Sequence, residues 1–536
     1  MTKHLQICAA TACVLLVAGS AAAQVIDRQR TDRADAPASA AGRAVANPNS
    51  PAAVTQVTPF ILRAVQVQGT SVAPSALESA TKPFLGQTVD AAAIAKIADA
   101  VSNAYSGSDI ALYTVVVPQQ DFAAGVLRLV VVEGFIEHVD INGDVDGDMS
   151  LIAAYGAKIA AEKPLRKSTF QRYVSLMRDI PGLTLDIQLL KGEAVGAARL
   201  SVKVTQQKWK ANFSIANRGQ NLLGSTTLGL DVTINSLLRQ GDQTVLSLGA
   251  PTEFNLYQFV GLSHATPLND DGTVAQIALG YLRTRPRAIA LEGEASSLQF
   301  AVSHPVIRSF DENLYVTGSI DGINSSNAIL GQIPANERIR AIRLAGAYSR
   351  TTPTNALTLR LSASFGLDGL GAHVTNPALE KVDFQKLNLR AGFGQKISET
   401  WTVRLNTAVQ LAGQELPTSE FQSFGGADFG RGYSTSAIFG DDGVAGSGEI
   451  AWKPATFPVD FLQGTEIYGF ADRSESWLRR RGLVPTSTTA LTSAGFGVRI
   501  PWGDNFSLDL SGAKPLAAPA LLKRDWLFGF SLHASY

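Results

Sequence analysis

The part of this chain from Lys208 to Tyr536 is a series of segments of roughly ten residues in which apolar residues alternate with polar or small ones. In the segment "WTVRLNTAVQLAG", large apolar side chains occupy nearly every second position, with Thr, Arg, Asn and Gln between them. A period of two is that of a β-strand with one apolar and one polar face. After the N-terminus no run of about 18 apolar residues occurs, which excludes helices that cross a membrane. The sequence therefore predicts β-structure from residue 208 onwards.

The polar face of these segments favours a membrane barrel over a soluble β-sandwich, which alternates too. Gly, Ser, Thr, Asn and Arg suit a wet lumen, and the apolar face suits lipid. Charged residues make up 17% of the chain, below the roughly 25% usual in soluble proteins. At roughly 20 residues for a strand and its connection, 329 residues predict a closed antiparallel barrel of about 16 strands. The last strand carries one apolar face, formed by Trp526, Phe528, Phe530, Leu532, Ala534 and Tyr536.

The N-terminus predicts export. Lys3 precedes an apolar run from Ile7 to Ala18, and a small-residue stretch, Ala21–Ala23, follows. This pattern is typical of a signal peptide, here residues 1–23, and the apolar run is too short for a membrane helix. Both cysteines, Cys8 and Cys13, lie inside it, so the mature chain is expected to contain no disulfide.

Three segments separate the signal peptide from the barrel. Residues 24–58 are rich in Ala, Asp, Arg, Pro and Ser and contain almost no large apolar residues, which predicts a linker. Residues 59–138 and 139–207 each show a β-α-α-β-β order, and the second copy of the order begins at Phe135. The fold class is therefore mainly β, with two small α/β domains before the barrel. Helical periodicity is found at 74–80, 91–105, 151–159 and 167–179.

Two stretches carry a resemblance to a known family. "YTVVVPQQDFAAGVLRLVVVEGFIEHVDINGD" contains a P-x-Q, a G-x-L and a V-x-E-G pattern. "FGGADFGRGYSTSAIFGDDGVAGSGEIAW" contains Arg431, Gly432 and Tyr433, and the later "FADRS" contains Asp472. With these motifs the chain resembles the two-partner secretion transporters, the outer-membrane proteins that activate and secrete haemolysins and filamentous haemagglutinins. Two departures are Gly430, where the family has valine, and Ser474, where it has glycine.

The resemblance implies how the parts work. The two small domains would be polypeptide-transport-associated (POTRA) domains in the periplasm, and their docking residues within 59–207 are unknown. A loop around 413–448 would fold back into the barrel, where the Arg431 side chain pairs with the Asp472 carboxylate. Arg431, Gly432, Tyr433 and Asp472 are thus the candidate pore-loop and gating residues. Residues 24–58 would include a helix that plugs the pore at rest.

The implied function is secretion of an unfolded partner without ATP. The partner would be a haemolysin- or haemagglutinin-like exoprotein of extended β-helical shape, and lipid and lipopolysaccharide of the outer membrane would surround the barrel. Physically, a guanidinium in a lumen needs a carboxylate, which supports the pairing.

Other functions find little support in the residues. There is no G-x-S-x-G and no G-x-x-x-x-G-K-[ST], so we expect neither an enzyme nor a nucleotide site. The six histidines lack metal-ligand spacing, and the aspartates of "DINGDVDGD" are interpreted as a polar turn, so no metal or other cofactor is expected. Lys+Arg and Asp+Glu both number 46, which gives no reason to expect nucleic acid. The cluster 479–481 is expected in a solvated loop.

Two alternative functions remain open at this point. One is an outer-membrane assembly factor of the same superfamily, which shares the Arg-Gly tip but commonly has three to five of the small domains by family pattern. The other is a passive porin, against which the tandem domains argue, because a diffusion pore does not need them.

Overall fold

The computed structural model describes residues 57–536 except for 146, 288–291, 331–332, 458, 460–461, 483, 504, 518–521 and 523–524. The predicted signal peptide, 1–23, lies outside the described residues, as does the predicted linker and plug, 24–58, apart from its last two positions. No helix among the described residues is long and apolar enough to cross a membrane.

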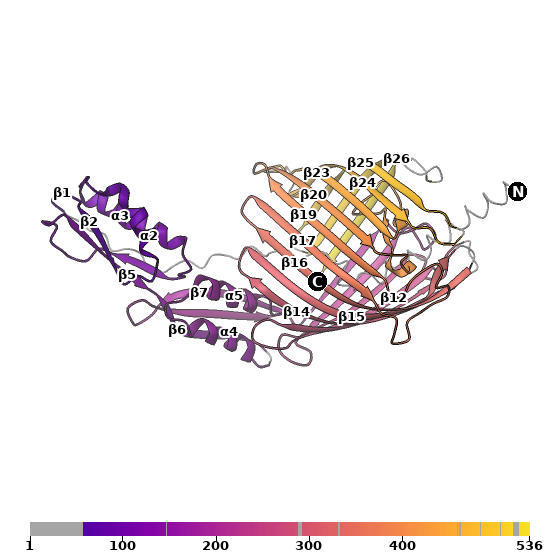
Figure 1. The fold of residues 1–536 in the computed structure, drawn as a ribbon, viewed down its shortest axis with the longest axis horizontal. Coiled ribbons are helices and arrows are strands. Elements are labelled where there is room, and N and C mark those ends of the chain that lie inside the picture. Colours follow the sequence, from indigo (N-terminus) through magenta and orange to yellow (C-terminus); the bar gives the residue numbers. More distant parts are fainter. Residues whose placement is uncertain are drawn as a thin grey trace.

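A closed antiparallel barrel forms the C-terminal part of the chain (Figure 1). Its sixteen long strands, among the described residues, are β9 (Trp209–Ala216), β10 (Thr227–Asn235), β11 (Gln243–Pro251), β12 (Tyr257–Pro267), β13 (Val274–Thr284), β14 (Gly293–Arg308), β15 (Glu312–Leu330), β16 (Ile333–Thr351), β17 (Asn355–Gly366), β19 (Gln385–Lys396), β20 (Trp401–Ala412), β23 (Asp442–Trp452), β24 (Glu466–Leu478), β25 (Ser487–Trp502), β26 (Phe506–Ala517) and β27 (Leu527–Ser535). Each pairs with its neighbours in the chain, and β27 closes the barrel on β9. The short β18 (His373–Val374) adds to β16. The predicted barrel of about 16 strands is confirmed.

The alternation in sequence separates the two faces of the barrel wall. On β20, Leu405 and Leu411 are exposed on the outside, whereas Gln410 is buried on the inside. On β17, Leu361 is exposed and Ser362 is buried. Closure gives every strand two neighbours, so the backbone needs no hydrogen bonds from lipid.

Two α/β units precede the barrel and extend to one side of it (Figure 1). The first unit consists of β1 (Phe60–Ile61), β2 (Ala64–Gln68), α2 (Pro74–Thr81), η1 (Lys82–Phe84), β3 (Thr88–Val89), α3 (Ala91–Ser106), β4 (Tyr113–Val116) and β5 (Val126–Glu133). The second consists of β6 (Phe135–Asp144), α4 (Ser150–Ala160), α5 (Lys167–Arg178), β7 (Leu183–Lys191) and β8 (Ala197–Gln206). Their sheets have the orders β2-β5-β4 and β6-β8-β7, and each packs its apolar face against its helices.

The four helices lie where the sequence periodicity predicted them. Helix α3 is capped at its N-terminus by Asp90, whose side chain accepts a hydrogen bond from Ala93 N (2.8 Å). One strand departs from expectation. β6 pairs with β8 from Phe135 to Asp144, so it crosses the limit drawn between 138 and 139. For the same reason Asp140 to Asp144 lie on this strand rather than in the predicted polar turn.

The P-x-Q and V-x-E-G patterns have local structural roles in the first unit. The Gln120 side chain accepts from Arg128 N (2.7 Å) and donates to Arg128 O (2.8 Å), so it pairs with β5 beyond the end of β4. Glu133 accepts from Ser71 N (2.7 Å) and from Tyr105 OH (2.8 Å). These bonds tie the loop after β2 and helix α3 to the end of β5.

The second unit is bound to one end of the barrel, which we call the domain end; the opposite end is the free end. Arg308, at the end of β14, donates to both carboxylate oxygens of Asp179, each at 2.6 Å. Asp271, in the turn between β12 and β13, accepts from Tyr173 OH (3.0 Å) and faces Lys158 Nζ (3.4 Å). A bidentate Arg–carboxylate pair fixes orientation as well as distance. The joint therefore holds this unit against the barrel strands.

Candidate functional site

The connection between β20 and β23 folds into the barrel. This lumenal loop, residues 413–441, contains η2 (Thr418–Glu420) and a hairpin of β21 (Gln422–Phe424) and β22 (Ile438–Gly440). The sequence placed the loop around 413–448; in the structure β23 starts at Asp442. Its apolar side chains pack against the inner wall, in a cluster of Ala408, Phe424, Phe429, Tyr433, Ile438, Ala445 and Leu491.

The loop tip, residues 430–433, is attached to the wall through its backbone. Gly430 N donates to Asp472 Oδ1 (3.0 Å) and Arg431 N donates to Asp472 Oδ2 (3.2 Å). Ser493 on β25 donates to Asp472 Oδ1 (2.6 Å) and accepts from Gly432 N (3.1 Å). Both carboxylate oxygens of Asp472 thus accept charge-assisted hydrogen bonds from the tip.

The structure corrects the predicted pairing of the Arg431 guanidinium with Asp472. Arg431 Nη1 donates instead to Glu449 Oε2 on β23 (2.9 Å), and the guanidinium lies over the Phe470 ring, 4.2 Å from its centroid. The reason is that two backbone N–H groups and the Ser493 hydroxyl already bind the Asp472 oxygens, whereas Glu449 presents a carboxylate oxygen beside the Arg431 guanidinium. The two predicted residues are brought together, but not through their side chains.

The contacts and backbone conformation of the tip explain why tyrosine and glycine occupy its other positions. The single proton of Tyr433 OH is shared between two backbone carbonyls, Thr492 O (2.9 Å) and Ala517 O (2.5 Å). A Cβ at Gly432 would lie 2.9 Å from Ser493 Cβ, so only glycine fits this close approach. Gly430 has a φ of +73°, a conformation that a β-branched valine avoids, which explains the departure from the family motif.

Arg431 belongs to a network of ion pairs on the lumen wall. Glu449 also accepts from Arg404 (3.0 Å) and Arg499 (2.7 Å), and Glu466 accepts from the same two arginines, each at 2.6 Å. Asp509 on β26 also pairs with Arg499 (3.1 Å), so six charged side chains from β20, β23, β24, β25, β26 and the loop share one cluster. Positive and negative side chains alternate in this cluster, so most of these charges have more than one partner across neighbouring strands. Glu449 therefore stays paired with Arg404 and Arg499 even without Arg431.

A second attachment, the loop root, holds η2 against β15, β16 and β19. Its Glu420 pairs with Arg343 Nη2 (2.9 Å) and with Lys386 Nζ (2.7 Å), and Arg343 pairs in turn with Asp321 (2.6 Å). All four side chains are buried, Arg343 at 1% and Glu420 at 0% exposure. Glu337 accepts from two backbone N–H groups of the same short helix, at 2.9 and 3.2 Å. Buried ion pairs tolerate the loss of neither partner.

Of the three arginines expected in a solvated loop, Arg480 is exposed, whereas Arg479 and Arg481 pair with carboxylates of the chain. Arg481 is 2% exposed, pairs with Asp441 and donates to Leu379 O and Leu416 O, each at 2.8 Å. Arg479 Nη2 pairs with Asp442 (3.0 Å). These side chains face the base of the lumenal loop, because the carboxylates that follow β22 attract them inward.

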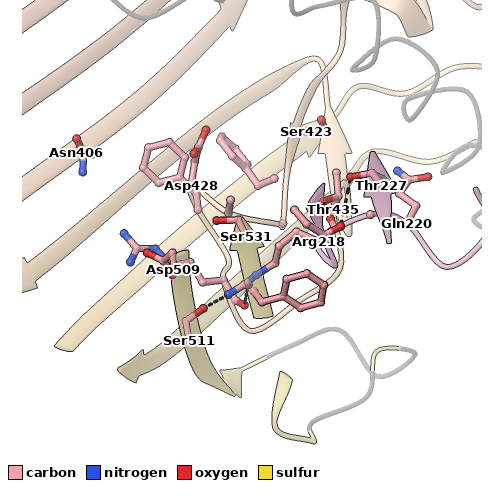
Figure 2. A pocket seen from close by; sticks show the side chains of 18 of the residues that line it. Arg218, Gln220, Thr227, Asn406, Ser423, Asp428, Thr435, Asp509, Ser511 and Ser531 are labelled. Carbon is pink, nitrogen blue, oxygen red and sulfur yellow. Dashed lines mark hydrogen bonds between the residues drawn. The ribbon is translucent and has the colours of Figure 1, made fainter. Parts of the chain in front are cut away.

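A cavity of about 970 Å³ remains between the tip and the wall (Figure 2). Arg218, just after β9, reaches across it and donates to Arg431 O (2.7 Å) and Ser511 Oγ (2.6 Å), while Thr435 Oγ1 donates to Arg218 O. The walls carry polar side chains, including Asn406, beside apolar ones such as Phe424. Among the described residues, no group of three His, Cys, Asp or Glu could hold a metal ion.

Sequence reasoning missed Glu449, Glu420 and Arg343, which hold the loop in place. A signal was present: each lies on a lumen-facing position or in the loop itself, where a charge needs a partner. Which partner it has depends on strands far apart in the chain, and no local pattern encodes that.

The chain matches a family model described as "Haemolysin secretion/activation protein ShlB/FhaC/HecB" over residues 196–500, more than half of its length. Residues 60–134 match a model described as "POTRA domain, ShlB-type". Among curated proteins it is similar to the heme/hemopexin transporter protein HuxB of Haemophilus influenzae, 20% identical over 464 residues that cover 81% of this chain and 79% of HuxB.

Solved structures share the fold. CdiB from Escherichia coli superposes with a TM-score of 0.71 at 18% identity, covering 96% of this chain and 97% of CdiB. BamA from Haemophilus ducreyi lacking POTRA domains 1–3 gives a TM-score of 0.54 at 14% identity, covering 90% of this chain and 100% of BamA. At these identities the likeness concerns the fold alone.

Proposed function

The chain belongs to the haemolysin secretion/activation family ShlB/FhaC/HecB, and on that premise we propose that it binds an unfolded exoprotein in the periplasm and passes it through its barrel without ATP. Membership itself makes it an outer-membrane transporter of a partner protein. In this proposal the domain end faces the periplasm and the free end faces the outside. The partner is haemolysin- or haemagglutinin-like, and the protein is not an enzyme.

The sheet edges support recognition of an unfolded chain. In the described residues no strand covers the outer edges of β2, β6 and β7. An extended peptide adds to such an edge through backbone hydrogen bonds, which accept many sequences. A moving substrate needs this tolerance.

The observation that carries the proposal is the lumenal loop, whose tip is held by non-covalent contacts: backbone hydrogen bonds to Asp472, the Arg431–Glu449 ion pair and the packing of Tyr433. Because these contacts are reversible and face a polar lumen, the tip is able to leave the wall when a chain enters. We assign gating to Arg431, Gly432, Tyr433 and Asp472, together with Glu449. Folding of the partner outside the cell would supply the free energy.

Transport into proteoliposomes tests this directly. The purified protein would be inserted into vesicles, and an unfolded partner, taken from the adjacent reading frame, would be added on the domain side without nucleotide. We expect protease-protected partner inside the vesicles. A strict need for ATP, or no transport by a correctly folded barrel, would contradict the proposal.

The alternative of an assembly factor has one observation in its favour, the fold shared with BamA. Depletion in cells separates the two functions. Loss of one secreted protein supports transport, whereas a general loss of outer-membrane barrels supports assembly. A porin would instead conduct steadily with the loop in place.

A further inference from the structure

The outward faces of neighbouring barrel strands change from apolar to polar near the free end. Five side chains that neighbour one another across β13 to β17 are 40–49% exposed and form an apolar row: Ile277, Phe300, Ile320, Ile342 and Phe365. Large apolar side chains with this exposure on a barrel wall face lipid chains. The row therefore lies within the membrane.

A polar row lies four residues further toward the free end, about 13 Å along the strands. Its members also neighbour one another in register: Tyr281, Ser296, Asn324, Arg338 and His373. Together they line a cavity of about 770 Å³ on the outer side of the wall. A tyrosine followed by hydrogen-bond donors is typical of the level at which lipid headgroups begin.

The cations at this row lack anionic partners. Arg340 lies two residues nearer the apolar row than Arg338, on the same strand. It donates to Asn324 Oδ1 (2.9 Å), Ile339 O (2.8 Å) and Leu370 O (3.2 Å), all neutral acceptors. Arg338 is exposed and forms no ion pair with any residue that the structure describes. Arg340 is thus held in position with its charge uncompensated.

The nearby carboxylates compensate only part of this charge. Glu292 is neutralised by Arg283 (2.9 Å) and Arg285 (2.7 Å). Glu294 also lines the cavity and hydrogen-bonds with the neutral Tyr281, so its charge offsets one of the two arginines. The neighbouring positions 288–291 and 331–332, which the structure does not describe, contain no acidic residue in the sequence. A net positive site therefore remains at Arg338 and Arg340.

We propose that Arg338, Arg340 and His373 bind the phosphate of a phosphorylated glycolipid, lipopolysaccharide, in the outer leaflet. Its acyl chains would lie against the apolar row and its phosphate at the polar row. Guanidinium groups bind phosphate through two parallel hydrogen bonds, and Asn324 and Ser296 add neutral donors. The proposal takes only the orientation of the barrel from the proposed function and does not depend on secretion.

Titration of the purified full-length protein in micelles with fluorescent deep-rough lipopolysaccharide tests the site. We expect Arg338→Gln/Arg340→Gln to weaken binding by about tenfold or more, since each substitution removes a charged hydrogen-bond donor. Arg350→Gln is the matched control, because Arg350 is exposed on the same face of β16 at the domain end. It should bind like the wild type.

Two further binding measurements identify the ligand. Dephosphorylated lipopolysaccharide should bind as weakly as the double variant does. If inorganic phosphate displaces the lipid at comparable concentration, the ligand is free phosphate and the lipid assignment is wrong. Equal binding by wild type and double variant overturns the site. Should the double variant not fold, Arg338→Glu, at an exposed side chain without an ion-pair partner, gives the same test.

Discussion

The two attachments of the lumenal loop use different chemistry. At the loop root, buried side chains pair with one another: Glu420 with Arg343 and Lys386. At the loop tip, the Asp472 carboxylate binds backbone N–H groups. The Arg431 side chain adds an ion pair with Glu449, and Glu449 remains paired with Arg499 if Arg431 is removed. Every residue except proline has a backbone N–H, so the tip depends on the acceptor more than on the tip side chain. The root depends on each of its charges.

This difference predicts which attachment yields first. On release the root loses the two buried ion pairs of Glu420, whereas the tip loses hydrogen bonds and one ion pair beside the cavity. We therefore expect the tip to leave the wall while the root remains as the hinge.

Arg343→Ala should have the largest effect. It leaves Asp321 buried without its ion-pair partner and Glu420 with Lys386 alone, so the free energy of unfolding should fall by about 3–5 kcal/mol. Heat-dependent gel mobility in detergent measures this, with the exposed Arg350→Ala as control. Equal melting of the two variants would mean that the root contributes nothing.

Asp472→Ala should have the next largest effect. It removes the acceptor for Gly430 N and Arg431 N, which costs about 1–3 kcal/mol of closed-state stability and raises channel opening in planar bilayers. Arg431→Ala should open the channel less, because both backbone bonds persist and Glu449 keeps Arg499. Ser474→Ala is the control, since Ser474 faces inward on the same strand and its hydroxyl has no hydrogen-bond partner in the described residues. If Arg431→Ala opened the channel more than Asp472→Ala, the Arg431 side chain would contribute more to closure than the backbone bonds to Asp472 do.

The free energy of unfolding should fall as pH rises, because of the buried Glu380, which lies between β18 and β19 and close to Glu337 of the loop root. Burial, and then the neighbouring Glu337, raise the pKa of Glu380 to about 9. Between its ordinary pKa, near 4.5, and 9 the folded state holds a proton that the unfolded state has lost, so stability falls with pH, by about 1.4 kcal/mol per unit. Melting temperatures across this range measure the slope, which Glu380→Gln should flatten. An unchanged slope in this variant would assign the pH dependence to other groups.

Tyr433→Phe should have the smallest effect. It keeps the ring in the apolar cluster but removes the hydroxyl bonds to Thr492 O and Ala517 O, a loss of about 0.5–1.5 kcal/mol. Single-channel recordings should show slightly more frequent openings than wild type and fewer than Asp472→Ala. Openings as frequent as those of Asp472→Ala would make the hydroxyl as important as the carboxylate.

Much of the fold was predictable because it follows from local pattern. The period of two assigned Leu405 to lipid and Gln410 to the lumen before any strand was paired. The helices α3 and α5 followed from apolar spacing in the same way. The candidate site was predictable only in part: Arg431 and Asp472 do meet, but the predicted bond between their side chains does not form.

The sequence by itself determined the strand faces, the barrel and the two α/β units, because each depends on residues close together in the chain. The loop with an Arg-Gly-Tyr tip was implied by the resemblance to a known family. The tertiary structure decided which charges pair. Arg343 and Glu420 are 77 residues apart, and Arg431 has acceptors on two neighbouring strands within reach. Only closure of the barrel sets those distances, since a charge in the lumen pairs with the partner that the strand register brings nearest.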